Sequence, residues 1–265
     1  KKTNNNMATE LHKSPIFGPV KSRRLGLSLG INLMPGDGKI CTFDCIYCEC
    51  GFNKERIPTL PRPAREEIKV ALGNKLREMA EDGTLPDVLT FSGNGEPTGH
   101  PHFAGIIDDT IELRDKYCPN ARVSVLSNAT FIGKTDVREA LMKVDNNILK
   151  LDTVCMEYIK LVDRPLQRHY DIREVIENMK KFNGHIIIQT MFMSGLLNGT
   201  DIDNTSGKYV EPWLNAIKEI CPQQVMIYTI DRDTPAVGLK KAEPKVLDSI
   251  KRQVEELGVA CSVAY

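Results

Sequence analysis

The chain has 265 residues, of which 41% are hydrophobic and 26% are charged, a composition typical of a globular protein with a full core. Lysine plus arginine equals aspartate plus glutamate at 35 each, so the overall charge does not indicate a polyanionic partner. No stretch approaches the roughly 20 consecutive apolar residues that span a bilayer, and the polar start lacks the apolar segment of a signal peptide. We therefore expect a cytoplasmic protein without a membrane partner.

The polar start KKTNNNMATELHKS also sets the expected domain boundary. It carries no apolar periodicity that could build a core. We expect residues 1–14 to form a disordered or tag-like tail and residues 15–265 to form one domain.

Apolar runs and amphipathic stretches alternate through the rest of the chain. Strands are predicted over 25–33, 87–92, 121–127, 147–152, 185–193 and 224–230, and helices over 64–83, 102–117, 171–182, 210–220 and 243–258. This alternation is typical of right-handed βαβ units. Because six units are too few to close an eight-unit barrel, the sequence predicts an α/β fold with a partial (β/α)6 TIM-like barrel of parallel strands. The polar stretch 194–208 is a candidate lid.

Four of the eight cysteines fall within residues 41–50, CTFDCIYCEC. In a reducing cytosol, clustered cysteines are metal ligands or redox groups more often than disulfides. Cys41, Cys45 and Cys48 follow the first predicted strand, on the face where parallel barrels carry their chemistry. Three thiolates can hold three corners of a [4Fe-4S] cluster and leave the fourth iron open. The alternative is a structural zinc site with Cys50 as the fourth ligand.

The spacing C-x3-C-x2-C, with Tyr47 directly before the last cysteine, resembles the signature of the radical S-adenosylmethionine (radical SAM) superfamily. The resemblance implies a [4Fe-4S] cluster on Cys41, Cys45 and Cys48, whose open iron binds S-adenosylmethionine (SAM). Reductive cleavage of SAM then gives a 5′-deoxyadenosyl radical that abstracts hydrogen from a substrate, with a donor such as flavodoxin or ferredoxin supplying the electron. Phe43 and Tyr47 would line the apolar wall near the cluster and the adenine.

A second motif, TFSGNGEPT, ends the next predicted strand. Gly93 and Gly95 permit backbone conformations and close approaches that a Cβ would block, and Glu96 can accept a hydrogen bond from an ammonium. The segment Gly93, Asn94, Gly95 and Glu96 resembles the glycine-glycine-glutamate element of the family, which receives the methionyl amine of SAM. A plain Asn-Gly turn is the alternative interpretation.

Polar residues also end the later strands. Ser127 and Asn128 follow the third strand, and Lys150 and Asp152 end the fourth on one side of the pleat. The family resemblance implies that such positions, Ser127, Asn128 and Asp152 among them, contact the carboxylate and ribose of SAM. Gln189, inside the fifth strand, is either a further SAM contact or a core amide with satisfied hydrogen bonds.

Three further stretches resemble one branch of the superfamily, the Fe-S oxidoreductases related to the wyosine-base synthases of tRNA modification. They are residues 18–36, the Arg-Pro pair at 164–165, and residues 227–239. Wyosine synthases carry further cysteines before the radical SAM loop, whereas residues 1–40 contain none. The resemblance therefore implies a related enzyme, oxidoreductase or transferase, without implying wyosine synthesis itself.

The substrate is the least determined part of the prediction. RNA such as tRNA, a peptide and a small anionic molecule all fit, and the candidate anion-binding residues are Arg23, Arg24, Arg164 and Arg232. Each arginine is also explained by an ion pair on the surface. The competing hypothesis from another class is a zinc-stabilised nucleic-acid-binding module without catalysis, which leaves the GNGEP element unexplained.

Overall fold

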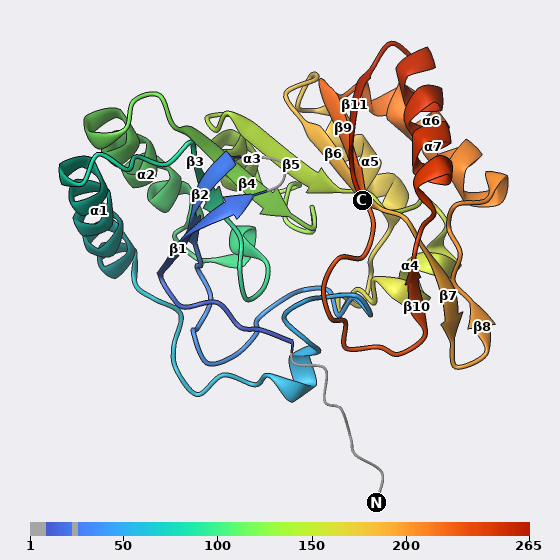
Figure 1. Cartoon of the computed structure of the whole chain (residues 1–265), viewed down its shortest axis with the longest axis horizontal. Helices are drawn as coiled ribbons and strands as arrows, with labels where there is room; N and C mark the ends of the chain where they lie inside the picture. Colours follow the sequence, from blue (N-terminus) through green and yellow to red (C-terminus); the bar gives the residue numbers. More distant parts are fainter. Residues whose placement is uncertain (1–8, 23–25) are drawn as a thin grey trace, which may run out of the picture.

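The computed structural model describes residues 9–22 and 26–265. Its main sheet has eight strands in the order β1-β2-β3-β4-β5-β6-β9-β11. β1 is antiparallel to β2, and each following strand pairs in parallel with its neighbour. The strands, visible in Figure 1, are β1 (Ile16–Ser22), β2 (Gly26–Ile31), β3 (Val88–Phe91), β4 (Arg122–Ser127), β5 (Asn146–Lys150), β6 (Ile187–Met191), β9 (Gln224–Tyr228) and β11 (Ala260–Ala264).

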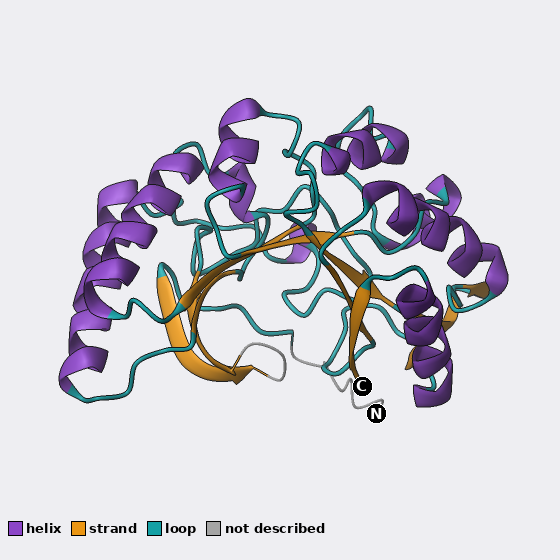
Figure 2. Cartoon of the chain, turned by 90° about the horizontal axis from the view of Figure 1, so that it is seen from above, coloured by secondary structure: helices purple, strands orange, loops and turns teal. Residues whose placement is uncertain are grey.

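The sheet curves into an open arch, and the helices cover its convex side (Figure 2). The helices are α1 (Arg65–Glu81), α2 (Phe103–Tyr117), α3 (Thr135–Leu141), α4 (Met156–Val162), α5 (Ile172–Lys180), α6 (Gly207–Ile220) and α7 (Pro244–Glu256), with short 3-10 turns η1 (Asn53–Glu55) and η2 (Pro97–Gly99). The main core fills the space between the two layers with side chains such as Leu29, Phe91, Val125, Ile188 and Trp213. The predicted α/β partial barrel is therefore confirmed.

Helix α1 illustrates how local sequence selects an element. The Ala64 backbone N–H donates to the Glu67 carboxylate, which satisfies one of the free donors at the helix start. Its apolar positions recur on one face and are buried: Ile68, Leu72, Leu76 and Met79. All five predicted helices are present, with ends shifted by up to a few residues.

Four elements of the sheet and its crossovers were not predicted. Helices α3 and α4 each have seven residues, which is too short for a clear helical periodicity. Strands β1 and β11 lie at the two sheet edges and carry mixed polar and small residues. β11 pairs in parallel with β9 and extends the six predicted parallel strands by one.

The stretch 194–208 is not an irregular polar loop. Strands β7 (Met193–Leu197) and β8 (Thr200–Asp201) form a hairpin, and β10 (Leu239–Lys241) pairs with β7 to give a separate three-stranded sheet. Helix α6 then begins at Gly207. The role of this segment as a lid stays a prediction.

Residues 9–14, the described part of the predicted tail, lie against the loops that follow β2 and β3. The His12 backbone N–H donates to Asn94 Oδ1 at 2.8 Å, and the Ser14 hydroxyl donates to the Asn32 carbonyl at 3.1 Å. Arg56 also donates to the Thr9 carbonyl. The division of the chain at residue 14 stays a prediction. In the described part of the chain, no helix is long and apolar enough to cross a membrane.

Candidate functional site

The cysteine loop, residues 40–53, is held from two sides. On one side, the Ile46 N–H donates to the Val162 carbonyl at the end of α4, at 2.9 Å. On the other side, Ile40 forms a β-bridge with Gly95 of the loop that follows β3. The loop therefore joins elements that are far apart in the sequence.

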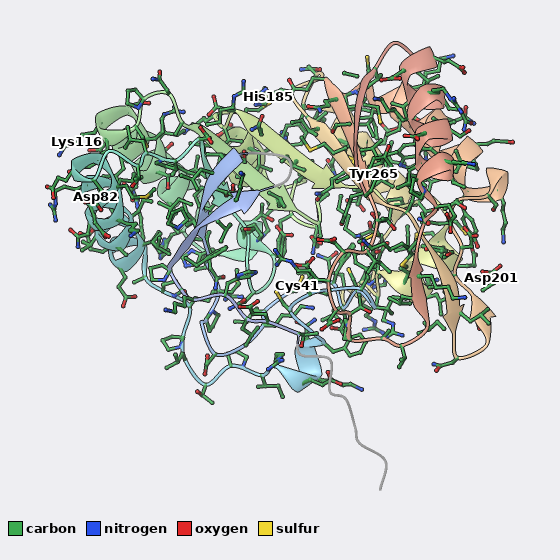
Figure 3. The ribbon with its side chains drawn as sticks, in the orientation of Figure 1. Cys41, Asp82, Lys116, His185, Asp201 and Tyr265 are labelled. Atoms are coloured by element: carbon green, nitrogen blue, oxygen red, sulfur yellow. The ribbon has the colours of Figure 1, made fainter. Side chains whose placement is uncertain are left out.

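Cys41, Cys45 and Cys48 are half-buried and unpaired. Figure 3 shows Cys41 near the middle of the molecule, whereas Asp82, after α1, and Asp201, in β8, lie at its opposite flanks. Cys41 therefore lies in the central region of the molecule, and Cys45 and Cys48 follow it in the same loop.

Cys41 and Cys45 face different neighbours. Burial, together with the nearby Glu96 carboxylate, raises the pKa of the Cys41 thiol to about 12. The Asn128 side-chain amide donates to Cys41 Sγ at 3.6 Å. Burial also raises the pKa of Cys45 well above its ordinary value, against the attraction of the Lys150 ammonium. Both thiols stay protonated at neutral pH unless a further positive charge reaches them.

Cys48 differs from the other two because it has a thiol donor. The hydrogen bond from the Cys50 thiol, aided by the Lys39 ammonium, outweighs burial and lowers the pKa of Cys48 to about 6. The neighbouring Cys48 and burial both raise the pKa of Cys50. The Cys50 thiol donates to the Gly93 carbonyl oxygen at 3.3 Å, so Cys50 connects the cysteine loop to the loop that follows β3.

The donor chemistry and arrangement fit a cluster better than a single ion. Among the residues that the structure describes, no three His, Cys, Asp or Glu side chains converge closely enough to hold one metal ion. A cubane cluster carries its thiolates on separate irons, so its ligands stand farther apart than the ligands of one zinc ion. Coordination to iron would also supply the positive charge that Cys41 and Cys45 need to become thiolates.

The first polar network beside the cysteine loop, here called the Glu96 network, consists of Glu96, Thr98, Ser127 and Asn128. The Glu96 carboxylate is 3% exposed and accepts from the Thr98 N–H at 3.0 Å, the Ser127 hydroxyl at 2.8 Å and the Asn128 N–H at 2.6 Å. Burial raises the pKa of Glu96, and these donors oppose the rise. The structure thus brings together three residues predicted separately: Glu96, Ser127 and Asn128.

The two glycines before Glu96 are required by close packing. Gly95 has φ +145°, and a Cβ there would lie 1.9 Å from the Ile40 carbonyl oxygen. Gly93 has φ +126°, and a Cβ there would meet the Asn32 side chain at 2.8 Å. The side chain of Asn94 is fully buried and donates to the carbonyls of His12 and Pro35, both at 2.8 Å. This loop therefore packs against the cysteine loop at Gly95, and against His12, Asn32 and Pro35 through Gly93 and Asn94.

The second network, here called the Lys150 network, consists of Tyr47, Lys150, Asp152 and Asp163. The Lys150 ammonium contacts the Asp152 carboxylate and the Tyr47 hydroxyl, and it lies 3.1 Å from Asp163 Oδ1. The Tyr47 hydroxyl also donates to Asp152. Although burial acts against it, the two carboxylates hold the pKa of Lys150 well above its ordinary value. The ammonium is thus paired with carboxylates inside the site.

Two further predicted residues line the same region. The Phe43 ring is 3% exposed, packs edge-on against Tyr170 at 5.4 Å, and forms a β-bridge through its backbone with Pro165. Gln189 lies beside Lys150 in the register of β5 and β6, and its side chain is half-buried. Their contacts with SAM stay predictions.

The candidate arginines make contacts within the chain. Arg164, two residues after the end of α4, has φ +52°. It donates from Nε to the Leu161 carbonyl at 3.1 Å and lies over the Phe52 ring. Arg232 pairs with Glu49 at 3.1 Å on the surface. Arg23 and Arg24 fall outside the described residues. A role of any of the four in binding anions stays a prediction.

Three residues of the site carried no signal in the sequence analysis. Asn32, which is fully buried, accepts from the Asn94 N–H at 3.2 Å. Asp163 completes the Lys150 network. Lys39 lies buried beside the cysteine loop. Only the position of Lys39, two residues before Cys41, could have drawn attention to it.

Comparisons with known proteins agree with this geometry. The family model described as the radical SAM superfamily matches residues 37–206. The chain belongs to the radical SAM superfamily. It is therefore an enzyme of the partial-barrel radical SAM group, and the predicted membership is confirmed.

Individual relatives extend beyond the matched region. A UPF0026 protein of Helicobacter pylori is 31% identical over 240 residues, which cover 88% of this chain and 71% of the relative. In fold, the chain resembles a radical SAM methyltransferase from Sphaerobacter thermophilus, with a TM-score of 0.65 and 15% identity over 90% of this chain. The chain spans 66% of that methyltransferase chain. A structure of TYW1 with a lysine-pyruvate adduct bound has a TM-score of 0.58 and 14% identity, covering 86% of this chain and 73% of TYW1.

Proposed function

We propose that this radical SAM enzyme holds one [4Fe-4S] cluster on Cys41, Cys45 and Cys48 and binds the methionyl amine of SAM at Glu96. When bound, the cluster and SAM together supply reductive cleavage to a 5′-deoxyadenosyl radical, which abstracts hydrogen from the substrate. The residues of the chain hold the three irons, accept the ammonium and exclude water from the reacting centre.

The observation that carries this proposal is the position of Asn128. Its backbone N–H donates to the Glu96 carboxylate at 2.6 Å, and its side-chain amide donates to Cys41 Sγ at 3.6 Å. One residue therefore fixes the proposed acceptor of the amine beside a proposed ligand of the cluster. A SAM molecule held by both the cluster and Glu96 would need this proximity.

The zinc alternative is not retained. The superfamily match identifies an enzyme, which a zinc-stabilised module without catalysis does not explain.

Anaerobic reconstitution tests the proposal directly. Wild-type protein should bind iron and sulfide in equal amounts and produce 5′-deoxyadenosine from SAM and dithionite. Cys45→Ala should lose both properties, because a cluster with two remaining thiolates has no stable site. Cys221→Ala is the matched control, since Cys221 is exposed and distant in sequence from the cysteine loop. Full iron content and activity in Cys45→Ala would refute the ligand assignment.

The proposed substrate is a macromolecule, RNA or polypeptide, with a flavodoxin or ferredoxin as the electron donor. The helices lie on the convex side of the sheet in Figure 2, so we expect the substrate to approach from the opposite side. The test is deuterium transfer into 5′-deoxyadenosine from labelled tRNA, peptide and metabolite pools, with Arg232→Ala compared with wild type. Label that arrives only from a small neutral metabolite, with Arg232→Ala fully active, would exclude both the macromolecule and the role of Arg232.

A further inference from the structure

Lys39 is a buried cation directly before the cysteine loop. Its side chain is 1% exposed, and its ammonium donates to the Gly51 carbonyl at 2.6 Å. The backbone N–H of Lys39 donates to the Arg56 carbonyl, also at 2.6 Å. Lys39 thus connects the start of the cysteine loop with Gly51 and Arg56, which follow the last cysteine of the loop.

The ammonium has incomplete charge compensation from carboxylates. Its nearest carboxylate oxygen, Asp44 Oδ1, lies 3.9 Å away and already accepts from the Asn53 N–H at 2.8 Å. The Gly51 carbonyl that accepts from the ammonium belongs to the turn that follows Cys48, because the Gly51 N–H donates to the Cys48 carbonyl at 2.9 Å. Lys39 is also only two residues before Cys41. A buried ammonium is costly unless anions surround it. The geometry therefore directs the charge of Lys39 toward the three proposed ligands.

We propose that Lys39 is a positioning residue that makes the cluster easier to reduce, an inference that rests on the proposed function above. In the reduction, one electron passes from a one-electron reductant, such as reduced flavodoxin or dithionite, to the cluster. No bond breaks and no proton moves. The reduced cluster carries one more negative charge than the oxidised cluster, so a nearby positive charge stabilises the reduced state more.

Two variants of Lys39 separate the effect of its charge from that of its hydrogen bond to Gly51, and a third variant is the control. Lys39→Gln removes the charge and keeps a side-chain donor, and Lys39→Arg keeps the charge. Lys54→Met is the control, because Lys54 is an exposed lysine in η1, close to the same loop. Each reconstituted protein is titrated against ambient potential without SAM, and the reduced cluster is quantified by electron paramagnetic resonance.

The comparison is made at the potential at which half of the wild-type cluster is reduced. There, the ratio of reduced to oxidised cluster in Lys39→Gln should be about tenfold lower. This is the effect expected for one unit charge about 10 Å from the cluster charge in a protein interior. Lys39→Arg and Lys54→Met should stay close to wild type. A Lys39→Gln protein with full iron content and an unchanged ratio overturns the proposal.

If Lys39→Gln does not assemble a cluster, Lys39→Met replaces it with the same expected drop. Failure of both neutral variants, with normal assembly and potential in Lys39→Arg, would show that folding of the loop needs the charge and would also overturn the proposal. Wild-type protein that holds no [4Fe-4S] cluster contradicts the proposed function itself, so the two failures are distinguishable.

Discussion

The Glu96 network and the Lys150 network flank the same cysteine loop, but they balance their charges differently. Glu96 is a buried carboxylate whose partners Thr98, Ser127 and Asn128 are neutral donors. In the Lys150 network, the ammonium lies between two carboxylates. A ligand ammonium gains most where a buried negative charge has only neutral partners. The difference favours Glu96 over Asp152 as the acceptor of the proposed methionyl amine.

The largest expected effect comes from breaking the contact between the Glu96 network and the cysteine loop. Gly95→Ala places a Cβ 1.9 Å from the Ile40 carbonyl oxygen, so the two loops must separate. We expect a loss of unfolding free energy above about 4 kcal/mol, together with loss of cluster assembly. Urea unfolding and iron analysis measure both.

Gly199→Ala is the control for Gly95→Ala. Gly199 also has a positive φ, +84°, but a Cβ there would meet no atom of the described residues within 4 Å. We expect a cost of only about 1–2 kcal/mol from backbone strain. Equal costs for the two variants would show that backbone strain, and not the contact with Ile40, explains the need for Gly95.

We expect the Lys150 network to contribute mainly to the free energy of unfolding. Lys150→Met leaves two buried carboxylates without their cation, and we expect a loss of about 3–5 kcal/mol of unfolding free energy. Lys143→Met, which breaks the exposed pair with Asp108, should cost less than about 1 kcal/mol. Chemical denaturation of both variants measures the difference, and a cost below about 1 kcal/mol for Lys150→Met would contradict the view that this network is charge-paired.

A smaller effect is a pH dependence that belongs to the Lys150 network. Burial raises the pKa of Asp163 to about 7 from an ordinary 3.8, against the attraction of Lys150. Because the folded-state pKa lies above the unfolded value, the folded protein binds more protons between these two values. This contribution to stability is complete below the unfolded pKa and is lost as the pH rises through about 7.

Asp163→Asn should therefore flatten the decrease in unfolding free energy between about pH 4 and pH 7. Denaturant titrations of the variant and the wild type across this range measure it. An equally steep decrease in both proteins would assign the titration to another group, with Glu96 as the first candidate because its pKa is also raised by burial.

The sequence alone predicts those parts of the site whose functional residues lie in short motifs. Cys41, Cys45 and Cys48 follow one predicted strand, and Glu96 follows the next, so parallel pairing alone predicts their proximity. The six predicted parallel strands follow equally from apolar runs that helices cover on one side.

Residues that act through distant partners could not be found in this way. Asp163 belongs to the site because α4, a seven-residue helix with weak periodicity, ends against the cysteine loop. Asn32 belongs to the site because its side-chain oxygen accepts a hydrogen bond from the backbone N–H of Asn94, 62 positions away. Such contacts depend on the tertiary packing of short elements, and local propensity does not determine that packing.

The most direct test of the account is SAM binding to Glu96→Gln, measured by calorimetry on reconstituted protein with equal iron content. Glutamine keeps the size of the side chain and removes the charge, so we expect affinity to fall by about tenfold to a hundredfold, the value of a hydrogen bond to a charged group. Asp152→Asn, in the charge-paired network, should lower the affinity less. Unchanged affinity in Glu96→Gln, or a larger loss in Asp152→Asn, would contradict the assignment of the amine to the Glu96 network.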